Sequence, residues 1–318
     1  MKRRWIHGKK KKKKSTVKRV ILTVLIILAL LIIIAAAFIF YKLTSLNSSI
    51  NDPLDRKHSE LRDGPLKKGE PISIALFGID SDEVRDSEHD GQRSDSIVLL
   101  SINPKDKKTE MISVPRDTHA EIVGKDTEEK INHAYAYGGP DMAVKSVEKL
   151  MDVPIDHYAA INMDGVSTLI DEVNGVDVVS NATFNVRDYT FEKGKKYHMD
   201  GKEALAFMRS RKEAGAGGDE GRQARQQLVI EAVAKKSMNP SSIPKINSIF
   251  NAVEDNVKTD LSLTDLNGIR SDYKSAQKNV NRHTLNGENT LGDDGLYYFY
   301  PSNNDQIVKD YKDNLNLK

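Results

Sequence analysis

PISIALFGID, residues 71–80, is a compact apolar run that ends in Gly78 and Asp80. Its length and composition are typical of a buried strand whose carboxyl end delivers the aspartate to a loop. Two runs of the same kind follow, SDSIVLLSIN at residues 94–103 and KKTEMISVPRD at residues 107–117. The three runs predict three strands at the start of the core.

Strand and helix patterns alternate through the rest of the chain. Helices are expected at residues 140–151, 164–175, 218–238 and 262–273, residues 199–211 are expected to begin as a helix, and strands are expected at residues 155–163, 176–180 and 295–302. The alternation predicts an α/β fold, a three-layer α/β/α sandwich around a mixed β-sheet, preceded by one transmembrane helix. Pro140 suits the first turn of its helix, and Asp200 suits the N-cap of its own.

The amino-terminal part has the sequence of a membrane anchor. Residues 1–19 contain eleven Lys or Arg and no acid, and residues 20–41, VILTVLIILALLIIIAAAFIFY, carry no charge. As a helix this run is long enough to cross the hydrocarbon core. A cleaved signal peptide is the alternative, but its apolar region is usually shorter. The positive-inside rule then predicts a single-pass type II protein of the cell membrane, with its amino terminus in the cytoplasm and residues 42–318 outside.

Composition excludes several classes of function. Without residues 1–19 the chain has 37 basic and 46 acidic residues, so its body is acidic and we expect no nucleic acid as partner. The chain has no cysteine, which excludes a disulfide framework, a thiolate nucleophile and a Cys-ligated metal. The polar residues 42–70 predict an extracellular stalk, and residues 71–318 predict a single extracellular domain.

FMRSRKEAGAGGDEGRQARQQ, residues 207–227, gathers four arginines around an Ala-Gly loop. Arg222 precedes Arg225 and Gln226 by three and four residues, so the three share a helix face. They lie in the first turns of the expected helix, where unpaired N–H groups and the helix dipole favour an anion.

The preceding residues allow two interpretations. If residues 207–211 are extended, Arg209 and Arg211 point to the same side and join the group on the helix. The whole set then suits a ligand with several negative charges, such as a diphosphate. A solvated surface with local acidic partners is the other interpretation.

Asp80 and Asp95 favour the diphosphate. Both lie at junctions of strand and loop, where α/β folds place their ligand sites. Two carboxylates together with phosphate oxygens and waters suit Mg²⁺, which prefers oxygen ligands. As single residues, each aspartate is equally typical of a turn or a cap.

Six runs resemble the LytR-CpsA-Psr family. They are ALFGID, RSDSI, ISVPRDT, KINHAYAYGGP, HMDGKEALAFMRSRK and GDEGRQARQQ, in the family's order between Ile74 and Gln227, about half the chain. Several linked motifs in order are far more specific than any one of them. Within the family, the lysine-rich head and the run YTFEKGKKYHMDG are most similar to the wall teichoic acid transferases of the LytR/TagU kind.

The resemblance implies an extracellular phosphotransferase with Mg²⁺ or Mn²⁺ as cofactor. It implies transfer of an anionic glycopolymer from an undecaprenyl diphosphate carrier to a peptidoglycan hydroxyl, the C6 hydroxyl of N-acetylmuramic acid. The implied partners are the lipid-linked glycopolymer, peptidoglycan and the lipid bilayer of a Gram-positive type envelope.

The resemblance also assigns roles to residues. The implied metal ligands are Asp80 and Asp95. The implied diphosphate-binding residues are Arg93, Arg116, Arg209, Arg211, Arg222 and Gln226. The implied catalytic residues are Asp95, Arg116, Asp219 and Arg222. Either Asp95 or Asp219 could serve as the base, and the residues leave that choice open.

Two other functions account for part of the sequence. An extracellular prenyl-diphosphate hydrolase would use the same metal site with water as the nucleophile. A non-enzymatic membrane regulator would use the basic head, but it gives no role to the exported Asp and Arg residues. One departure from the family pattern is Glu-Ala-Gly-Ala-Gly-Gly between Lys212 and Asp219. The conformation of this loop therefore does not follow from the resemblance.

Overall fold

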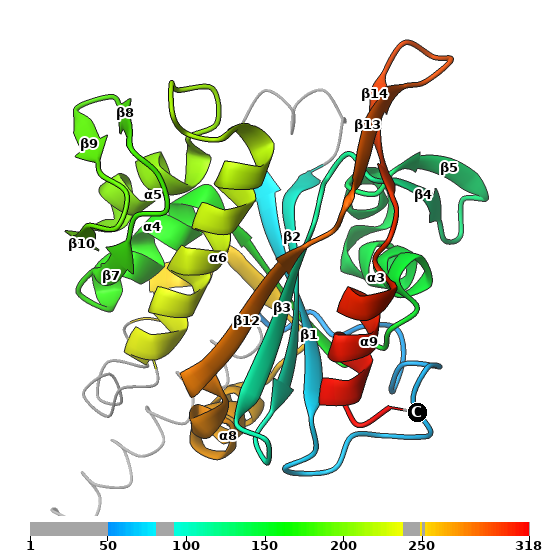
Figure 1. Ribbon diagram of the computed structural model, residues 1–318. Helices are drawn as coiled ribbons and strands as arrows, with labels where there is room; N and C mark the ends of the chain where they lie inside the picture. The colour runs from blue at the N-terminus through cyan, green and yellow to red at the C-terminus, as the bar shows by residue number, and fades with distance from the viewer. Residues whose placement is uncertain (1–49, 81–91, 238–248, 250–251, 318) are drawn as a thin grey trace, which may run out of the picture. The chain divides into compact units, whose positions relative to one another are not determined.

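The computed structural model describes residues 50–80, 92–237, 249 and 252–317 (Figure 1). They belong to one compact unit, residues 48–318. The predicted basic head, the predicted transmembrane helix and the first part of the predicted stalk lie outside the described residues. Within the described ranges, no helix has both the length and the apolar character needed to cross a bilayer.

A six-stranded mixed sheet forms the centre of the unit, in the order β11-β6-β1-β2-β3-β12. Its strands are β1 (Ile72–Asp80), β2 (Arg93–Asn103), β3 (Lys108–Val114), β6 (His157–Asn162), β11 (Val257–Thr259) and β12 (Asn279–Thr284). β2 pairs antiparallel with β1 and β3, as β11 does with β6, whereas β1 and β6, and β3 and β12, are parallel. The predicted α/β fold around a mixed sheet is therefore confirmed.

Helices connect and cover these strands. They are α3 (His133–Met151), α4 (Met163–Glu172), α5 (Gly201–Arg209), α6 (Gly218–Ser237), α8 (Leu263–Asp272), the 3₁₀ helix η2 (Lys274–Lys278) and α9 (Asp305–Asn314). Figure 1 shows α3 and α9 on one side of the sheet and α6 on the other. The five predicted helices all coincide with observed ones.

Side chains of the central strands alternate between two apolar layers. In β1, Ala75, Phe77 and Ile79 belong to the core that includes α3 and α9. Ile72 and Ile74, which are out of step by one residue, pack in a separate cluster on the other face. Because a strand repeats every two residues, β1 buries both of its faces, and this explains its continuous apolar sequence.

Helix α3 begins earlier than its sequence pattern predicts. It starts at His133, but Gly138 and Gly139 have non-helical backbone angles, so two helical segments meet at a kink. Pro140 follows directly and opens the second segment, where its missing N–H has no helical partner to lose. The predicted start at Pro140 is therefore the start of the second segment only.

A second apolar core joins α4, α5 and α6 to two small sheets. The sheets are β7 (Val176–Val179) with β10 (Lys196–Met199), and β8 (Phe184–Val186) with β9 (Tyr189–Phe191). The predicted strand at residues 176–180 thus pairs with β10 and not with the central sheet. Asp200 caps α5 as predicted, because its side chain accepts a hydrogen bond from the N–H of Glu203 at 2.8 Å.

Two further hairpins flank α3 and α9. They are β4 (His119–Ile122) with β5 (Thr127–Lys130), and β13 (Gly287–Leu291) with β14 (Tyr297–Pro301). β14 coincides with the predicted strand at residues 295–302.

Residues 50–70, the described part of the predicted stalk, pack against the domain. Ile50 is fully buried. Arg56 forms an ion pair with Glu148 of α3, and Arg62 forms one with Asp156 at 2.6 Å. The polar residues of this segment suggest a free linker, but in the structure they form ion pairs with residues far along the chain.

The pairing of β1 with β2 contains a bulge near the carboxyl end of β1. Gly78 is opposite Ser96 and Ile79 is opposite Ser94, so Asp95 is an extra residue without a partner in β1. A bulge of this kind turns a side chain away from the regular alternation of the strand. The close approach requires glycine, since a Cβ on Gly78 would lie 2.9 Å from the Cβ of Ser96.

Gly78→Ala should therefore lower the free energy of unfolding by about 1–3 kcal/mol, the usual range for overpacking. Urea unfolding of the purified protein measures the change. Gly268→Ala is the matched control, because a Cβ on Gly268 in α8 meets no atom within 4 Å. The control should raise stability by roughly 0.5–1 kcal/mol. Equal unfolding midpoints for Gly78→Ala and the parent would contradict a tight bulge.

Candidate active site

Asp95 and Arg116 form the sheet side of the candidate site. Arg116 follows Pro115 at the end of β3, and its Nη1 donates to Oδ2 of Asp95 at 2.8 Å. Nδ2 of Asn132 lies 3.4 Å from the other carboxylate oxygen of Asp95. Both partners of the ion pair are largely shielded, with 18 % and 26 % of their side chains exposed. The pair is thus fixed by its neighbours and only partly screened by solvent.

Asp219 is the centre of the helix side. Nη2 of Arg222 lies 2.6 Å from its Oδ1, and Nε of Arg211 lies 3.4 Å from the same atom. Nε2 of Gln223 donates to the second carboxylate oxygen at 2.7 Å. Asp219 stands in the first turn of α6, where the helix dipole stabilises a negative charge.

The two halves belong to one electrostatic group, here named the arginine–aspartate cluster: Asp95, Arg116, Arg211, Asp219 and Arg222. Burial lowers the pKa of Arg222; Arg116 and Arg211 add to this effect, while Asp219 and Asp95 oppose it. Burial also lowers the pKa of Arg116, but Asp95, Asp117 and Asp219 outweigh it and the net shift is upward. Asp117 is itself paired with Lys130 at 3.0 Å, so the three guanidiniums and two carboxylates of the cluster keep a formal excess of positive charge.

Two of these arginines have an N–H group that donates no hydrogen bond. Among the described residues, Nε of Arg116 and Nε of Arg222 are buried and have no hydrogen-bond partner. Oδ2 of Asp117 lies 3.7 Å from Nε of Arg116, too far for a hydrogen bond. A buried donor without a partner is costly, and an acceptor bound here would remove that cost.

Gln226 and Gln227 hold this end of α6 against the sheet. Oε1 of Gln226 accepts a hydrogen bond from Ser96 at 3.0 Å. Nε2 of Gln227 donates to Oγ of Ser113 at 2.9 Å and to the carbonyl of His283 at 2.7 Å. Gln226, predicted to bind a ligand, therefore also positions the helix.

Arg225 does not join the cluster, although the helix pattern places it beside Arg222. It is fully buried and donates to the carbonyl oxygens of Phe207 at 2.9 Å, Ala216 at 2.8 Å and Ser210. Its guanidinium lies 4.7 Å from the ring centroid of Phe184. Burial lowers the pKa of Arg225 to about 10. Arg225 is therefore a structural residue that fixes the end of α5 and the loop after it.

Arg209 and Arg211 separate, contrary to the interpretation that groups them. The premise of an extended segment is wrong, because Phe207 and Arg209 are in α5 and the chain becomes extended only at Ser210. Arg211 joins Asp219, whereas Arg209 lines a pocket beneath the β8–β9 hairpin.

The Ala-Gly loop contacts the rest of the domain through Gly215 and Ala216. Ala216 is fully buried, and its carbonyl accepts from Arg225. Gly215 has a φ of 84°, and a Cβ there would lie 2.2 Å from the carbonyl oxygen of Thr183. The small residues of this loop thus allow it to lie directly on the chain before β8.

The predicted metal ligands lie on adjacent strands. Asp80 is opposite Arg93 in the β1–β2 register, and Asp95 is two residues farther along β2. The side chain of Asp80 lies outside the described part. Among the described residues, no three His, Cys, Asp or Glu side chains gather as a metal cage. The carboxylate of Asp95 keeps lone pairs beyond its two contacts, so its chemistry fits a Mg²⁺ held by one or two carboxylates and substrate oxygens.

Sequence reasoning missed Asn132 and Gln223, which contact Asp95 and Asp219. Asn132 lies within the run KINHAYAYGGP, and Gln223 directly follows Arg222. Only the positions of Asn132 and Gln223 beside motif residues could have indicated a role in the site, because a single amide residue is common in any loop or helix.

Arg225→Met should lower the free energy of unfolding by about 3 kcal/mol or more, since three buried carbonyls lose their donor. Arg282→Met is the control, because Arg282 forms an exposed pair with Glu231 worth less than about 1 kcal/mol. Thermal and urea unfolding measure both changes. Similar losses in the two variants would show that Arg225 does not hold the loop.

The chain has many similar proteins of known name. It is 38% identical over 282 residues to the "Polyisoprenyl-teichoic acid--peptidoglycan teichoic acid transferase TagU" of Bacillus subtilis, covering 87% of this chain and 89% of the relative. A crystal structure of a protein described as a transcriptional regulator from Enterococcus faecalis is 39% identical, with a TM-score of 0.68 over 78% of this chain and 89% of that one. A structure of "TagT bound to LIIa-WTA" is 30% identical, with a TM-score of 0.68 over 84% of this chain and all of that one.

The family model named LytR_cpsA_psr matches residues 37–315. This match extends well beyond the motifs between Ile74 and Gln227 and includes the sheet, α6 and α9. The predicted resemblance is confirmed, and the chain belongs to the LytR_cpsA_psr family.

Proposed function

We propose that this protein is a teichoic acid transferase, as the name of its relative from Bacillus subtilis says of that protein. It moves an anionic glycopolymer from undecaprenyl diphosphate to a peptidoglycan hydroxyl, the C6 hydroxyl of N-acetylmuramic acid, and releases undecaprenyl phosphate. The observation that carries the proposal is the arginine–aspartate cluster at the start of α6, with its two unpaired guanidinium N–H groups.

The cluster suits a diphosphate for three reasons. Its excess positive charge is partly buried, where attraction to an anion is screened less than in water. The N–H groups at the start of α6 and its dipole favour a phosphate at the same place. The Nε atoms of Arg116 and Arg222 supply donors that phosphate oxygens would satisfy. In our proposal Arg93 and Gln226 border the same site, and Arg211 closes it.

The reaction needs little covalent chemistry from the protein. The acceptor hydroxyl attacks the phosphorus nearest the polymer, a new O–P bond forms, and the bond from this phosphorus to the bridging oxygen breaks. The departing undecaprenyl phosphate takes the electron pair, and the guanidiniums stabilise the charge that develops. A Mg²⁺ held by Asp80 and Asp95 would supply further neutralisation of the phosphate oxygens when bound.

Asp95 and Asp219 both stay candidates for the base that takes the hydroxyl proton. Each carboxylate already accepts from an arginine, Asp95 from Arg116 and Asp219 from Arg222. A metal on Asp95 would make that residue a poorer base, which favours Asp219 if the metal proposal holds. Asp219 is also the more exposed of the two, with 36 % of its side chain accessible.

The prenyl chain has a candidate path along α6. An apolar recess of about 60 Å³ lies between β2, β3, β12, α6 and η2, lined among others by Leu100, Met111 and Ile230. Ile230 is eight residues along α6 from Arg222, or about 12 Å at 1.5 Å per residue. Because the recess is much smaller than a long prenyl chain, we propose that α6 or η2 shifts outward when the lipid binds.

The hydrolase and the non-enzymatic regulator explain fewer of these observations than the transferase does. A hydrolase would use the same cluster with water in place of the sugar hydroxyl, so only the product distinguishes it. A non-enzymatic regulator provides no reason to hold unpaired arginine donors in a buried cluster, where they cost stability.

Arg222→Lys should reduce transfer about ten- to hundredfold, because lysine keeps the charge but cannot bind two phosphate oxygens with a planar fork. The assay follows labelled polymer from a prenyl diphosphate donor into peptidoglycan, with the full-length protein. Arg282→Lys, at an exposed pair away from the cluster, is the control and should stay within about twofold. Unchanged transfer in Arg222→Lys would contradict the proposed clamp, and release of free polymer would favour the hydrolase.

Asp80→Asn and Asp95→Asn should each raise the Mg²⁺ concentration needed for half-maximal transfer by at least about tenfold. If both act through one ion, the double variant should lose much less than the product of the two single losses. Independent, multiplicative losses would mean that the two carboxylates do not share a metal.

A further inference from the structure

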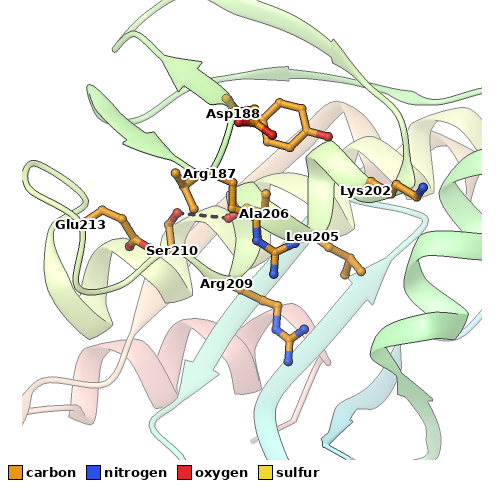
Figure 2. A pocket seen from close by; sticks show the side chains of 10 residues that line it. Arg187, Asp188, Lys202, Leu205, Ala206, Arg209, Ser210 and Glu213 are labelled. Atoms are coloured by element: carbon orange, nitrogen blue, oxygen red, sulfur yellow. Dashed lines mark hydrogen bonds between the residues drawn. The ribbon is translucent and has the colours of Figure 1, made fainter.

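A pocket of about 450 Å³ lies between the β8–β9 hairpin and α5 (Figure 2). This volume is within the usual range of small-molecule sites. The hairpin contributes Val186, Arg187, Asp188 and Tyr189, and its floor is formed by α5. Its floor lies within the run HMDGKEALAFMRSRK, and Arg209 there is one of the implied diphosphate-binding residues, but Arg187 and Asp188 on the hairpin lie outside the family runs.

The floor of the pocket is one face of α5. Lys202, Leu205, Ala206 and Arg209 line it, and their spacing of three or four residues places them in a row. The row carries a positive charge at each end and apolar groups between. Such a floor suits a ligand that has an anionic group and a less polar body, as a charged sugar does.

Arg187 lies opposite this row, at the tip of the hairpin. It has a φ of 51°, a left-handed conformation that glycine or asparagine adopts at lower energy. An arginine at this angle is therefore less stable than glycine would be. In Figure 2 the side chain of Arg187 extends over the same pocket that Arg209 lines.

The hairpin is held firmly in this place. Phe184 and Phe191 have ring centroids 5.1 Å apart, and Phe207 of α5 lies 5.9 Å from Phe184 and 4.9 Å from Phe191. Phe191 and Phe207 are fully buried. The position of Arg187 relative to α5 is therefore set by aromatic packing and not by a free loop.

The charges in the pocket do not neutralise one another. Within the described part of the chain, Arg187, Lys202 and Arg209 have no ion-pair partner, although Asp188 and Glu213 also line the pocket. Glu213 instead accepts from the backbone N–H of Arg211 at 2.7 Å. All three side chains are exposed, and because they line one pocket from two elements, they present a local excess of positive charge to an anion.

The pocket adjoins the proposed diphosphate site. Arg209, on its wall, is separated by Ser210 alone from Arg211, which belongs to the arginine–aspartate cluster. Ser210 is buried and its Oγ donates to the carbonyl of Ala206 at 3.1 Å, so the chain between the two sites is fixed. A substrate that extends beyond its diphosphate could thus place another charged group here.

We infer that this pocket is a second anion subsite, in which Arg187, Lys202 and Arg209 bind a phosphate or carboxylate carried by a saccharide. The inference rests on the proposed transfer reaction. The anion has two sources in that reaction, the backbone phosphates of the polymer on the donor and the peptide carboxylate of the muramyl acceptor. Arginine and lysine side chains bind a phosphate and a carboxylate through the same charge-assisted hydrogen bonds.

Arg187→Gly is the sharpest test, because it removes the charge and also relieves the left-handed strain, so the variant should fold at least as well as the parent. Three probes are titrated into the full-length protein: geranylgeranyl diphosphate, the same lipid diphosphate bearing a glycerol phosphate oligomer, and muramyl dipeptide. We expect unchanged affinity for the first and at least about fivefold weaker binding of one of the other two, with the loss decreasing at high salt.

Lys107→Gly is the matched control. Lys107 is an exposed cation with a φ of 56° in the turn between β2 and β3, at the opposite end of β2 from Asp95. It should bind all three probes like the parent. A loss with the oligomer assigns the subsite to the donor, and a loss with muramyl dipeptide assigns it to the acceptor.

Parent-like binding of both charged probes by Arg187→Gly would overturn the subsite. That result leaves the proposed function intact as long as the parent transfers polymer. Failure of the parent to bind geranylgeranyl diphosphate would instead contradict the proposed function itself, so the two failures can be distinguished.

Discussion

The buried guanidinium of Arg225 is the contact on which the arrangement of the site depends. It donates to one carbonyl at the end of α5, one just after it and one in the Ala-Gly loop, and it lies against the ring of Phe184 below the β8–β9 hairpin. One side chain of α6 thus fixes the elements that carry Arg187, Arg209 and Arg211. A cation in this position is costly to bury, and the three carbonyls together with the aromatic face compensate for its lost hydration.

A second constraint acts on the sheet side. The bulge that Gly78 permits makes Asp95 the extra residue of β2, where it meets Arg116 from the end of β3. The hydrogen bonds of Gln226 and Gln227 then bring the start of α6 to this edge. The cluster forms because a strand irregularity, a strand end and a helix start are held at one place by uncharged contacts.

The cluster is less stable than it could be. Two arginine N–H groups without partners and an excess of positive charge oppose folding, as does the left-handed backbone at Arg187. Functional sites commonly retain such features because a ligand satisfies them. In the proposed reaction, the arginine–aspartate cluster and the pocket under the hairpin would share a substrate with two anionic groups, one on each side of Ser210.

Local sequence determined much of this protein. The apolar runs of β1, β2 and β3, the capping Asp200 and the long helix after the glycines follow from residue patterns, because a strand or a helix has its own period and end signals. The ordered motifs determined the family, and with it a set of site residues of which Asp95, Arg116, Arg211, Asp219 and Arg222 come together.

Tertiary structure alone decided which arginines come together. Helix spacing groups Arg222 with Arg225, yet one is in the cluster and the other is in the core, since burial depends on what packs against each face of α6. A strand-like spacing of two residues also groups Arg209 with Arg211. Because α5 ends between them, Arg209 lines the hairpin pocket and Arg211 lies beside Asp219. Only the tertiary structure shows that residues 186–189 and residues 202–213 line one pocket, because these segments meet through the packing of Phe184, Phe191 and Phe207.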